Sequence, residues 1–220
     1  MIETVIKVGG SLGKNSNLQN LLQNISDFGT RHKILLVPGG GIFANTVRDY
    51  EQRFGLAGDA GHWMSILAMD QYGHLLASMV ENSTLVQELN AAHMAIASGK
   101  IPIFLPYHFL AQTDVLPKSW DVTSDSIAAW LADLAGARQL ILLKSVDGLF
   151  TDSKSANSRA NLMETASLSQ VACSEDLVDR YFCSIAKTTS LDIWLVNGNY
   201  PERLEQLLET GSAKGTNLHQ

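Results

Sequence analysis

The sequence predicts an α/β fold in which helices cover both faces of a mostly parallel sheet, a three-layer αβα sandwich. Short continuous apolar runs end at glycine or proline, which is typical of strands buried on both faces of a parallel sheet. Segments with apolar residues at helical spacing alternate with these runs. The 220 residues, 45% of them hydrophobic and 17% charged, suit one domain with a substantial core.

Each element is supported by its own pattern. The predicted buried strands are 4–8, 34–37, 101–105, 140–143 and 193–196. A helix is predicted over 121–135, because Ile127, Trp130, Leu131 and Leu134 fall three or four residues apart, and Gly136 follows as its stop. We expect a mobile polar loop over 152–161, a frayed tail over 212–220, and a division into two lobes near residue 117.

Charge and cysteine content argue against several classes of protein. The formal net charge of −6 disfavours binding to nucleic acid or to an anionic membrane. The chain has no apolar run of about 18 residues, and its first residues do not resemble a secretory signal. Cys173 and Cys183 have no CxxC spacing and no cluster of histidines nearby, so we expect no zinc site or disulfide framework and a reducing, cytoplasmic compartment.

The first predicted strand ends in a lysine and two glycines. Lys7 precedes Gly9, Gly10 and Ser11, so bare backbone N–H groups could meet an anion while the lysine adds a positive charge. A tight turn explains this segment equally well. The segment matches neither the P-loop nor the dinucleotide-binding pattern.

The second predicted strand ends in three glycines, Gly39, Gly40 and Gly41, and a helical pattern follows. The start of that helix would face a ligand with free N–H groups. Three glycines are costly for a turn alone, so anion binding is favoured here. Because parallel strands end at one edge of a sheet, both glycine turns should lie there. Two phosphate sites side by side indicate transfer of phosphate between two molecules.

Two later segments carry further candidates. Asp121 and Asp125 are one helical turn apart and would share a face. Spacing alone favours helix capping, and the alternative is that they hold lysines or a metal. Lys144 and Ser145 follow the 140–143 strand, and turn chemistry alone explains the Asp147-Gly148 step that comes next.

In this order and spacing, the segments KVGGS, VPGGG, DVTSD and LLKSVDGLF resemble the amino acid kinase family over about residues 5–204. This resemblance implies the carbamate kinase-like form of the αβα fold and the use of ATP with Mg²⁺. The stretches HWMSILAMDQYG, WDVTSDSIAAW and VNG are similar to the small family members that phosphorylate [5-(aminomethyl)furan-3-yl]methyl phosphate in methanofuran biosynthesis.

The resemblance also implies roles for single residues. Lys7 would bridge the transferring phosphoryl group, Asp125 would orient the catalytic lysines, and Asp121 would lie near the phosphates. The residues expected to bind ATP are Gly9, Gly10, Ser11, Lys144, Ser145, Asp147, Gly148, Phe150 and Asn197. Those expected to bind the acceptor are Lys14, Gly39, Gly40, Gly41 and His62. No metal ligand is assigned. Residues 1–117 would bind the acceptor and 118–220 the nucleotide, and a homodimer or higher homo-oligomer is expected by analogy.

The chain departs from the family pattern at two places. Relatives often have Thr-Asp or Ser-Asp where this chain has Lys144-Ser145, and many have a late Gly-Gly-Met-x-x-Lys segment that is absent here. Lys187 is the candidate for that late lysine. Arg48 is expected to be a solvated side chain, with contact to a phosphate as the alternative. For His62, contact with the acceptor phosphate is weighed against a purely structural role. Two alternatives therefore stay open, a non-catalytic nucleotide- or oxyanion-binding homologue and a kinase for another phosphate such as isopentenyl phosphate.

Overall fold

A computed structural model describes residues 1–14, 17–151, 161–172 and 177–220. Most of the predicted loop over 152–161, together with Cys173, lies outside these residues. The described strands form one eight-stranded sheet with the order β3-β4-β2-β1-β5-β7-β8-β6. The strands are β1 (Thr4–Val8), β2 (Ile34–Pro38), β3 (Ser83–Val86), β4 (Ile101–Phe104), β5 (Gln139–Lys144), β6 (Thr165–Ser167), β7 (Asp192–Asn197) and β8 (Gly215–His219).

All neighbouring strands are parallel except β7 and β8, which pair antiparallel. The mostly parallel sheet is confirmed, and so are the five predicted strands. The sequence patterns did not reveal β3, β6 and β8. Strands β1–β4 occupy one half of the sheet and β5–β8 the other, with β1 paired to β5 in the middle. The predicted division into two lobes near residue 117, with separate functions for the two halves, stays a prediction.

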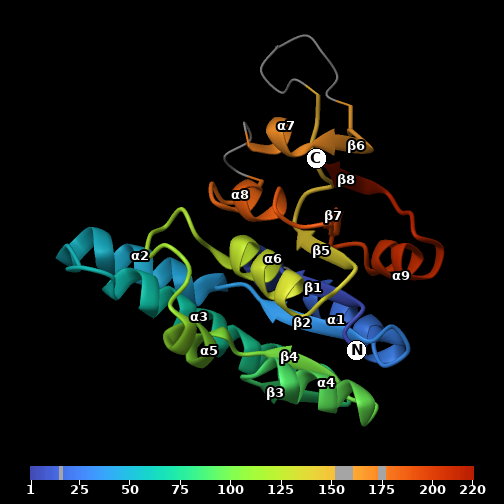
Figure 1. The fold of residues 1–220 in the computed structure, drawn as a ribbon, viewed down its shortest axis with the longest axis horizontal. Helices are drawn as coiled ribbons and strands as arrows, with labels where there is room; N and C mark the ends of the chain where they lie inside the picture. The colour runs from blue at the N-terminus through green and yellow to red at the C-terminus, as the bar shows by residue number, and fades with distance from the viewer. Residues whose placement is uncertain (15–16, 152–160, 173–176) are drawn as a thin grey trace.

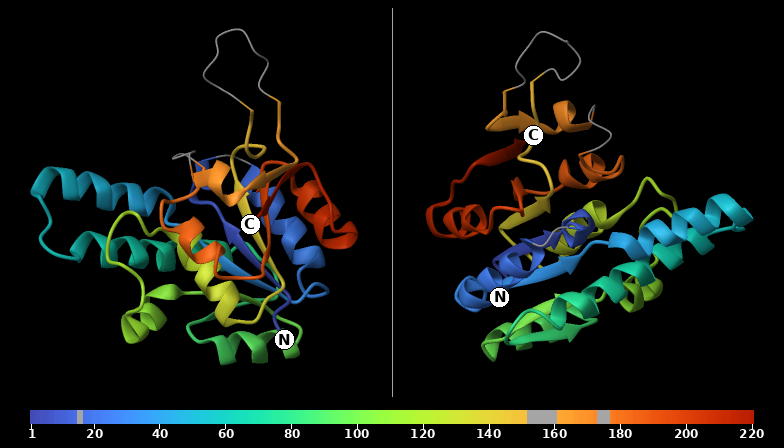
Figure 2. Two further views of the ribbon diagram at one scale, coloured as in Figure 1. Left: turned by 45° about the horizontal axis from the view of Figure 1, so that its top comes forward. Right: turned by 180° about the vertical axis from the view of Figure 1, so that it is seen from behind.

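Helices cover both faces of the sheet (Figure 1 and Figure 2). They are α1 (Asn17–Phe28), α2 (Gly41–Phe54), α3 (Ala60–Ala77), α4 (Leu89–Ala97), α5 (Pro106–Thr113), α6 (Ser124–Leu134), α7 (Leu168–Ala172), α8 (Phe182–Ala186) and α9 (Pro201–Thr210), with the short 3₁₀ helix η1 at Gly10–Lys14. In the described ranges, no helix is both long enough and apolar enough to cross a bilayer.

The core has two parts because successive strand residues point to opposite faces. On one face, Val5 of β1 packs in a cluster with Ile127 and Leu131 of α6. On the other face, Ile6 packs in a cluster with Leu21 of α1 and Leu204 of α9. Both faces of the sheet are therefore buried, which confirms the three-layer arrangement.

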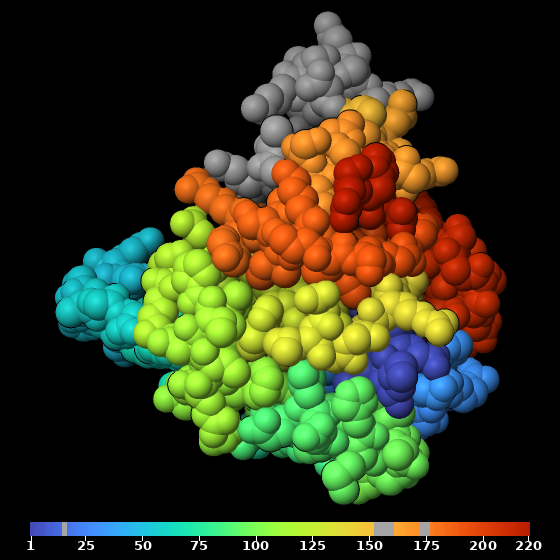
Figure 3. All heavy atoms as spheres, in the orientation of Figure 1, coloured from blue at the N-terminus to red at the C-terminus, as the bar shows by residue number. Residues whose placement is uncertain are grey.

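Helices α2 and α3 pack against each other and project beyond the sheet, at the left of Figure 1 and Figure 3. Helix α2 begins at Gly41, directly after β2. The first turns of α2 therefore lie at the carboxyl edge of the sheet, where the predicted site is expected.

The C-terminal tail is an ordered strand, so the expected fraying is wrong for most of it. Strand β8 pairs with β7 and with β6, and Leu218 lies opposite Ile193 and Ala166. The side chain of Leu218 is only 4% exposed and belongs to the core on the α6 face. Strand β8 is ordered because it pairs with a strand on each side, which its short sequence GTNLH does not reveal.

Replacing Leu218 with alanine tests this placement. We expect Leu218→Ala to lower the free energy of unfolding by about 2–4 kcal/mol, because it leaves a cavity in a packed core. Leu134→Ala is the matched control, since Leu134 is 49% exposed on α6. Urea denaturation measures both. Equal small losses in the two variants would contradict a buried β8.

Candidate active site

The two glycine turns contact each other at the carboxyl edge of the sheet. Strands β1 and β2 pair in register, which places Val8 beside Pro38 just before the turns. A Cβ atom added to Gly39 would lie 2.7 Å from the amide nitrogen of Gly10, and one added to Gly10 would overlap the backbone of Gly41. Side chains at these positions would force the turns apart, so glycine is required for their close approach.

Two of the predicted phosphate-binding amides are already used within the sheet. The N–H of Gly9 donates to the carbonyl of Leu143 (3.0 Å), and that of Gly39 donates to the carbonyl of Val8 (2.9 Å). The expectation that Gly9 offers its N–H to ATP is therefore wrong, and Gly39 equally has no free amide for the acceptor. Both residues extend the sheet and hold the turns in place.

A buried carboxylate between two lysines forms the centre of the site. The Nζ of Lys144 donates a hydrogen bond to Oδ2 of Asp125 (2.6 Å). The Nζ of Lys7 lies 2.9 Å from Oδ1 of the same carboxylate, an ion pair without good hydrogen-bond alignment. The side chains of Lys7 and Asp125 are each 6% exposed, and that of Lys144 is 14% exposed. The structure thus brings Lys7 and Asp125 together as predicted and adds Lys144.

Strand register explains how these side chains meet. Lys7 is opposite Leu142 on β5, so Lys144 projects from the same face two residues further along. Helix α6 packs on β1 and β5 over this face, and Asp125 lies in its first turn. The positive end of the helix dipole also favours a carboxylate at that position.

Opposing effects set the pKa values of this cluster. Burial alone would raise the pKa of Asp125, but the charges of Lys144 and Lys7, together with the hydrogen bond from Lys144, lower it to about 2. Burial lowers the pKa of Lys144 to about 8, against the attraction of Asp125 and with help from the repulsion of Lys7. Two ammonium groups share one carboxylate, so the cluster carries one net positive charge in a largely buried place beside a cavity, which attracts an anion.

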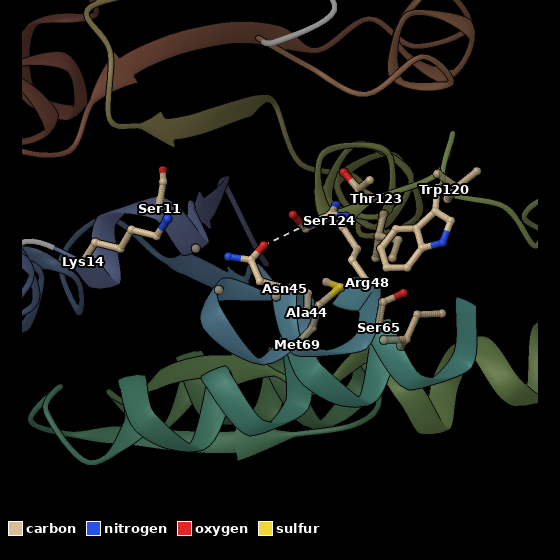
Figure 4. A pocket seen from close by; sticks show the side chains of 16 residues that line it. Ser11, Lys14, Ala44, Asn45, Arg48, Ser65, Met69, Trp120, Thr123 and Ser124 are labelled. Carbon is tan, nitrogen blue, oxygen red and sulfur yellow. Dashed lines mark hydrogen bonds between the residues drawn. The ribbon is translucent and has the colours of Figure 1, made fainter. Parts of the chain in front are cut away.

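Two cavities border the first turn of α6. The glycine-side cavity, of about 260 Å³, is bounded by Gly10, Gly40 and Gly41, and also by Ser11, Lys14 and Ser65. The lysine-side cavity, of about 500 Å³, is bounded by Asp121, Asp125, Lys144, Asp179 and Arg180. Arg48, Trp120 and Thr123 border both cavities. Figure 4 shows Ser11 and Lys14 at one end of the glycine-side cavity and Trp120 and Ser65 at the other.

Arg48 is exposed, as expected, but its side chain also has defined partners. Its guanidinium lies 4.5 Å from the centre of the Trp120 ring, and its Nη1 donates to Oδ1 of Asn45 (3.1 Å; Figure 4). The indole N–H of Trp120 in turn donates to the Glu51 carboxylate. A cation is thereby held at the border of the two cavities. Sequence spacing gave no signal for this pairing, because Arg48 and Trp120 are far apart in the chain.

Asp121 does not share a helical face with Asp125. Helix α6 begins at Ser124, so Asp121 lies in the preceding turn. Its side chain is 57% exposed and its Oδ1 lies 3.7 Å from the Arg180 guanidinium. The carboxylate borders the lysine-side cavity, and its role near the phosphates stays a prediction.

Asp179, which sequence reasoning missed, caps helix α6. Its Oδ2 accepts hydrogen bonds from the backbone N–H and hydroxyl of Thr123 (3.0 and 2.8 Å) and from the N–H of Ser126 (3.0 Å). Its Oδ1 accepts from the Ser126 hydroxyl and from the N–H of Phe182 (2.9 Å). Capping was expected from the segment that holds Asp121, but a carboxylate distant in sequence supplies it.

The predicted nucleotide loop after β5 is held by its own contacts. Asp147 Oδ1 accepts from Asn197 Nδ2 (2.8 Å) and Arg203 Nη1 (2.7 Å), and Lys214 lies 3.3 Å from Oδ2. Burial would raise the pKa of Asp147, but these donors lower it to about 2. Asp147 and Asn197 thus join the loop to β7 and α9, and neither borders the two cavities.

The remaining loop residues have different surroundings. Gly148 has a φ of +144°, and a Cβ there would overlap the hydroxyl of Thr216, so only glycine fits. Phe150 forms an isolated bridge with Leu162 and is partly exposed, while Ser145 is exposed beside Lys144. Nucleotide contacts of these three residues stay predictions.

His62 does not border the glycine-side cavity, so its expected contact with the acceptor is not supported. Its ring packs edge-on against Trp63, at a centroid distance of 5.2 Å, and hydrogen bonds to the backbone of Ser119. Burial lowers the pKa of His62 despite that hydrogen bond. A buried, neutral histidine suits a structural role. Lys187, the candidate late lysine, is exposed at the end of α8 and borders neither cavity.

Removing the cap tests the function of Asp179 in placing α6. We expect Asp179→Ala to lower the free energy of unfolding by about 2 kcal/mol, because it leaves several N–H and O–H donors unsatisfied. Asp133→Ala, at an exposed position of the same helix, is the control. Thermal and urea denaturation measure both variants. A loss no larger than that of the control would show that the cap is dispensable.

Comparison with known proteins gives the family. The amino acid kinase family model matches residues 3–179. Among curated proteins, the [5-(aminomethyl)furan-3-yl]methyl phosphate kinase of Methanocaldococcus jannaschii is 30% identical over 206 residues, covering 93% of this chain and 92% of the relative. The uridylate kinase of Methanococcoides burtonii is 23% identical, covering 97% and 96%.

Solved structures show the same fold. The uridylate kinase of Archaeoglobus fulgidus superposes with a TM-score of 0.78 at 18% identity, over 99% of this chain and 100% of that one. The isopentenyl phosphate kinase of T. acidophilum gives 0.62 at 17% identity, again over 99% and 100%. The family match spans most of the chain, and the fold agrees with that of these solved structures. The chain is a kinase and belongs to the amino acid kinase family.

Proposed function

We propose that the protein transfers the γ-phosphoryl group of ATP to the phosphate of a small molecule, giving ADP and a diphosphate. The observation that carries this proposal is the cluster of Lys7, Asp125 and Lys144, of which Asp125 and Lys144 border the lysine-side cavity next to the glycine-side one. One cavity would hold the acceptor and the other the nucleotide. The cluster supplies net positive charge where the phosphoryl group would pass.

The glycine-side cavity suits a phosphate acceptor. Its lining combines Gly10, Gly40 and Gly41 with the cations Lys14 and Arg48, and no carboxylate borders it in the described residues. An oxygen of the bound phosphate would attack the γ-phosphorus in line, forming one P–O bond while the bond to ADP breaks. A phosphate oxygen is already deprotonated, so the protein needs to supply alignment and positive charge rather than a strong base.

The wall of this cavity favours a flat, partly polar acceptor. Trp120 and Met69 offer apolar surface, while Ser65 and Asn45 add polar groups to the lining. An isopentenyl chain would prefer a wholly apolar pocket, and this lining is not wholly apolar. We therefore propose [5-(aminomethyl)furan-3-yl]methyl phosphate, the substrate in the name of the 30% identical relative, as the acceptor.

Mg²⁺ would arrive with the ATP phosphates rather than on a protein site. In the ranges that the structure covers, no group of three or more His, Cys, Asp or Glu side chains could hold a metal. The Asp125 carboxylate already contacts two lysines, and the Asp179 carboxylate already accepts the hydrogen bonds that cap α6. These carboxylates do not fit a protein-held metal, so no step is assigned to one.

The alternative of a non-catalytic homologue is less well supported. The main support for a non-catalytic homologue is that Lys144-Ser145 replaces the Thr-Asp of relatives. In the structure, however, Lys144 donates a hydrogen bond to the Asp125 carboxylate and so adds a cation to the site. Binding alone does not require two lysines on one buried carboxylate. A homodimer or higher homo-oligomer stays a prediction.

Turnover with candidate phosphates tests the proposal directly. We expect ADP release that depends on the acceptor, with a diphosphate product detected by mass spectrometry. Lys7→Ala should lower kcat by about 10²–10³-fold, because it removes charge next to the transferring group. Lys100→Ala, at an exposed position, is the control. ATP binding without turnover across a broad panel of phosphates would favour the non-catalytic alternative.

Arg48 offers a second test of the acceptor cavity. We expect Arg48→Ala to raise the KM for the acceptor by about 10–100-fold, the loss of one charge-assisted hydrogen bond. Arg31→Ala, far from both cavities on the surface, is the control. Steady-state kinetics with varied acceptor measures the effect. An unchanged acceptor KM in Arg48→Ala would place the acceptor elsewhere.

A further inference from the structure

We propose that Lys144 is a second catalytic lysine, which contacts the transferring phosphoryl group from the nucleotide side and acts together with Lys7. This inference rests on the proposed phosphotransfer function. Lys144, at the end of β5, would then supply the positive charge that we expected from a lysine late in the chain, Lys187.

The geometry places the two ammonium groups on one carboxylate. Lys7 and Lys144 each contact a different oxygen of Asp125, at 2.9 and 2.6 Å. Two like charges are thus held close together in a largely buried position, with a single negative charge to balance them. Leaving a buried cation only partly neutralised is costly, so the arrangement favours an anionic ligand that contacts both lysines.

The surroundings of Lys144 indicate the side from which it acts. Lys144 borders the lysine-side cavity together with Arg180 and Asp121, and it does not border the glycine-side cavity. Lys7 borders neither cavity and reaches the cluster from β1, two residues before the Gly9-Gly10 turn. A phosphoryl group that leaves the lysine-side cavity would therefore meet the ammonium group of Lys144, with that of Lys7 on the other oxygen of the same carboxylate. Charge that develops on its oxygens would be stabilised throughout the transfer.

The charged groups around Lys144 predict a dependence on pH. Asp125 and Lys7 face it directly, Asp179 attracts it from the α8 side, and Asp121 and Arg180 share its cavity. Lys144 must be protonated to act as a cation, and burial lowers its pKa to about 8. Activity should therefore be complete at lower pH and decline as the pH rises through about 8. Arginine at this position would keep its charge, since its pKa is above about 12.

Substitution at position 144 tests the inference. We expect Lys144→Met to lower kcat by about 10²–10³-fold while the acceptor KM changes little. Lys144→Arg should retain part of the activity and move the alkaline decline to higher pH. Lys187→Met is the matched control, expected to behave as the wild type, and thermal denaturation checks that each variant folds. A Lys144→Met kcat close to that of the control, or an alkaline decline that stays in place in Lys144→Arg, would overturn the inference.

A binding measurement separates this inference from the proposed function. We expect Lys144→Met to weaken binding of a non-hydrolysable ATP analogue by about tenfold or more, measured by calorimetry, since a charge-assisted contact is lost. This test holds even if no acceptor supports turnover, in which case the proposed function fails by itself. Unchanged affinity for the analogue in a folded Lys144→Met variant would count against a nucleotide-side contact.

Discussion

The Asp125 carboxylate, held between two lysines, is the interaction on which the site depends. It joins β1, β5 and α6 at one point, because each of these elements supplies one member of the cluster. The carboxylate balances one of the two ammonium charges in a buried place, and it raises the pKa of Lys144 against the larger lowering effect of burial. Without Asp125, two neighbouring cations would repel each other next to the apolar core. With it, the cluster retains a net positive charge that is available to a phosphoryl group.

Two structural features fix the position of this cluster relative to the cavities. The glycine turns let the ends of β1 and β2 approach so closely that their backbones touch, which leaves room for a small ligand rather than for side chains. The Asp179 cap joins the first turn of α6 to the start of α8, and thereby fixes the helix turn from which Asp125 projects. Backbone packing and one long-range helix cap therefore position the residues of the cluster. Arg48 and Trp120 form a wall that the two cavities share.

Much of this could be predicted from the sequence, and the rest depends on contacts between distant segments. Apolar runs revealed the central strands, and glycines at strand ends placed the site at the carboxyl edge of the sheet. Strand β8 escaped notice because GTNLH is short and mostly polar, and its order comes from pairing with β7 and β6. Arg48 could not be assigned, because its position depends on Trp120, which no spacing rule connects to it.

The cluster of Lys7, Asp125 and Lys144 also could be predicted only in part from the sequence. Lys7 and Asp125 were predicted through the family pattern, while Lys144 looked like a departure from that pattern. Only the register of β5 against β1 shows that Lys144 lies on the same face as Lys7, within reach of the same carboxylate. Asp121 was placed on a helix that begins three residues later, and the cap expected from its segment comes from Asp179 instead.

A crystal structure with ADP, the acceptor phosphate and a planar mimic of the phosphoryl group would test the central claim most directly. The account predicts that the mimic lies between the two cavities, with Nζ of Lys7 and Nζ of Lys144 both within hydrogen-bond distance of its oxygens. The acceptor phosphate should then contact the turn at Gly40 and Gly41. A mimic bound away from both ammonium groups, which remain on Asp125 alone, would contradict the account.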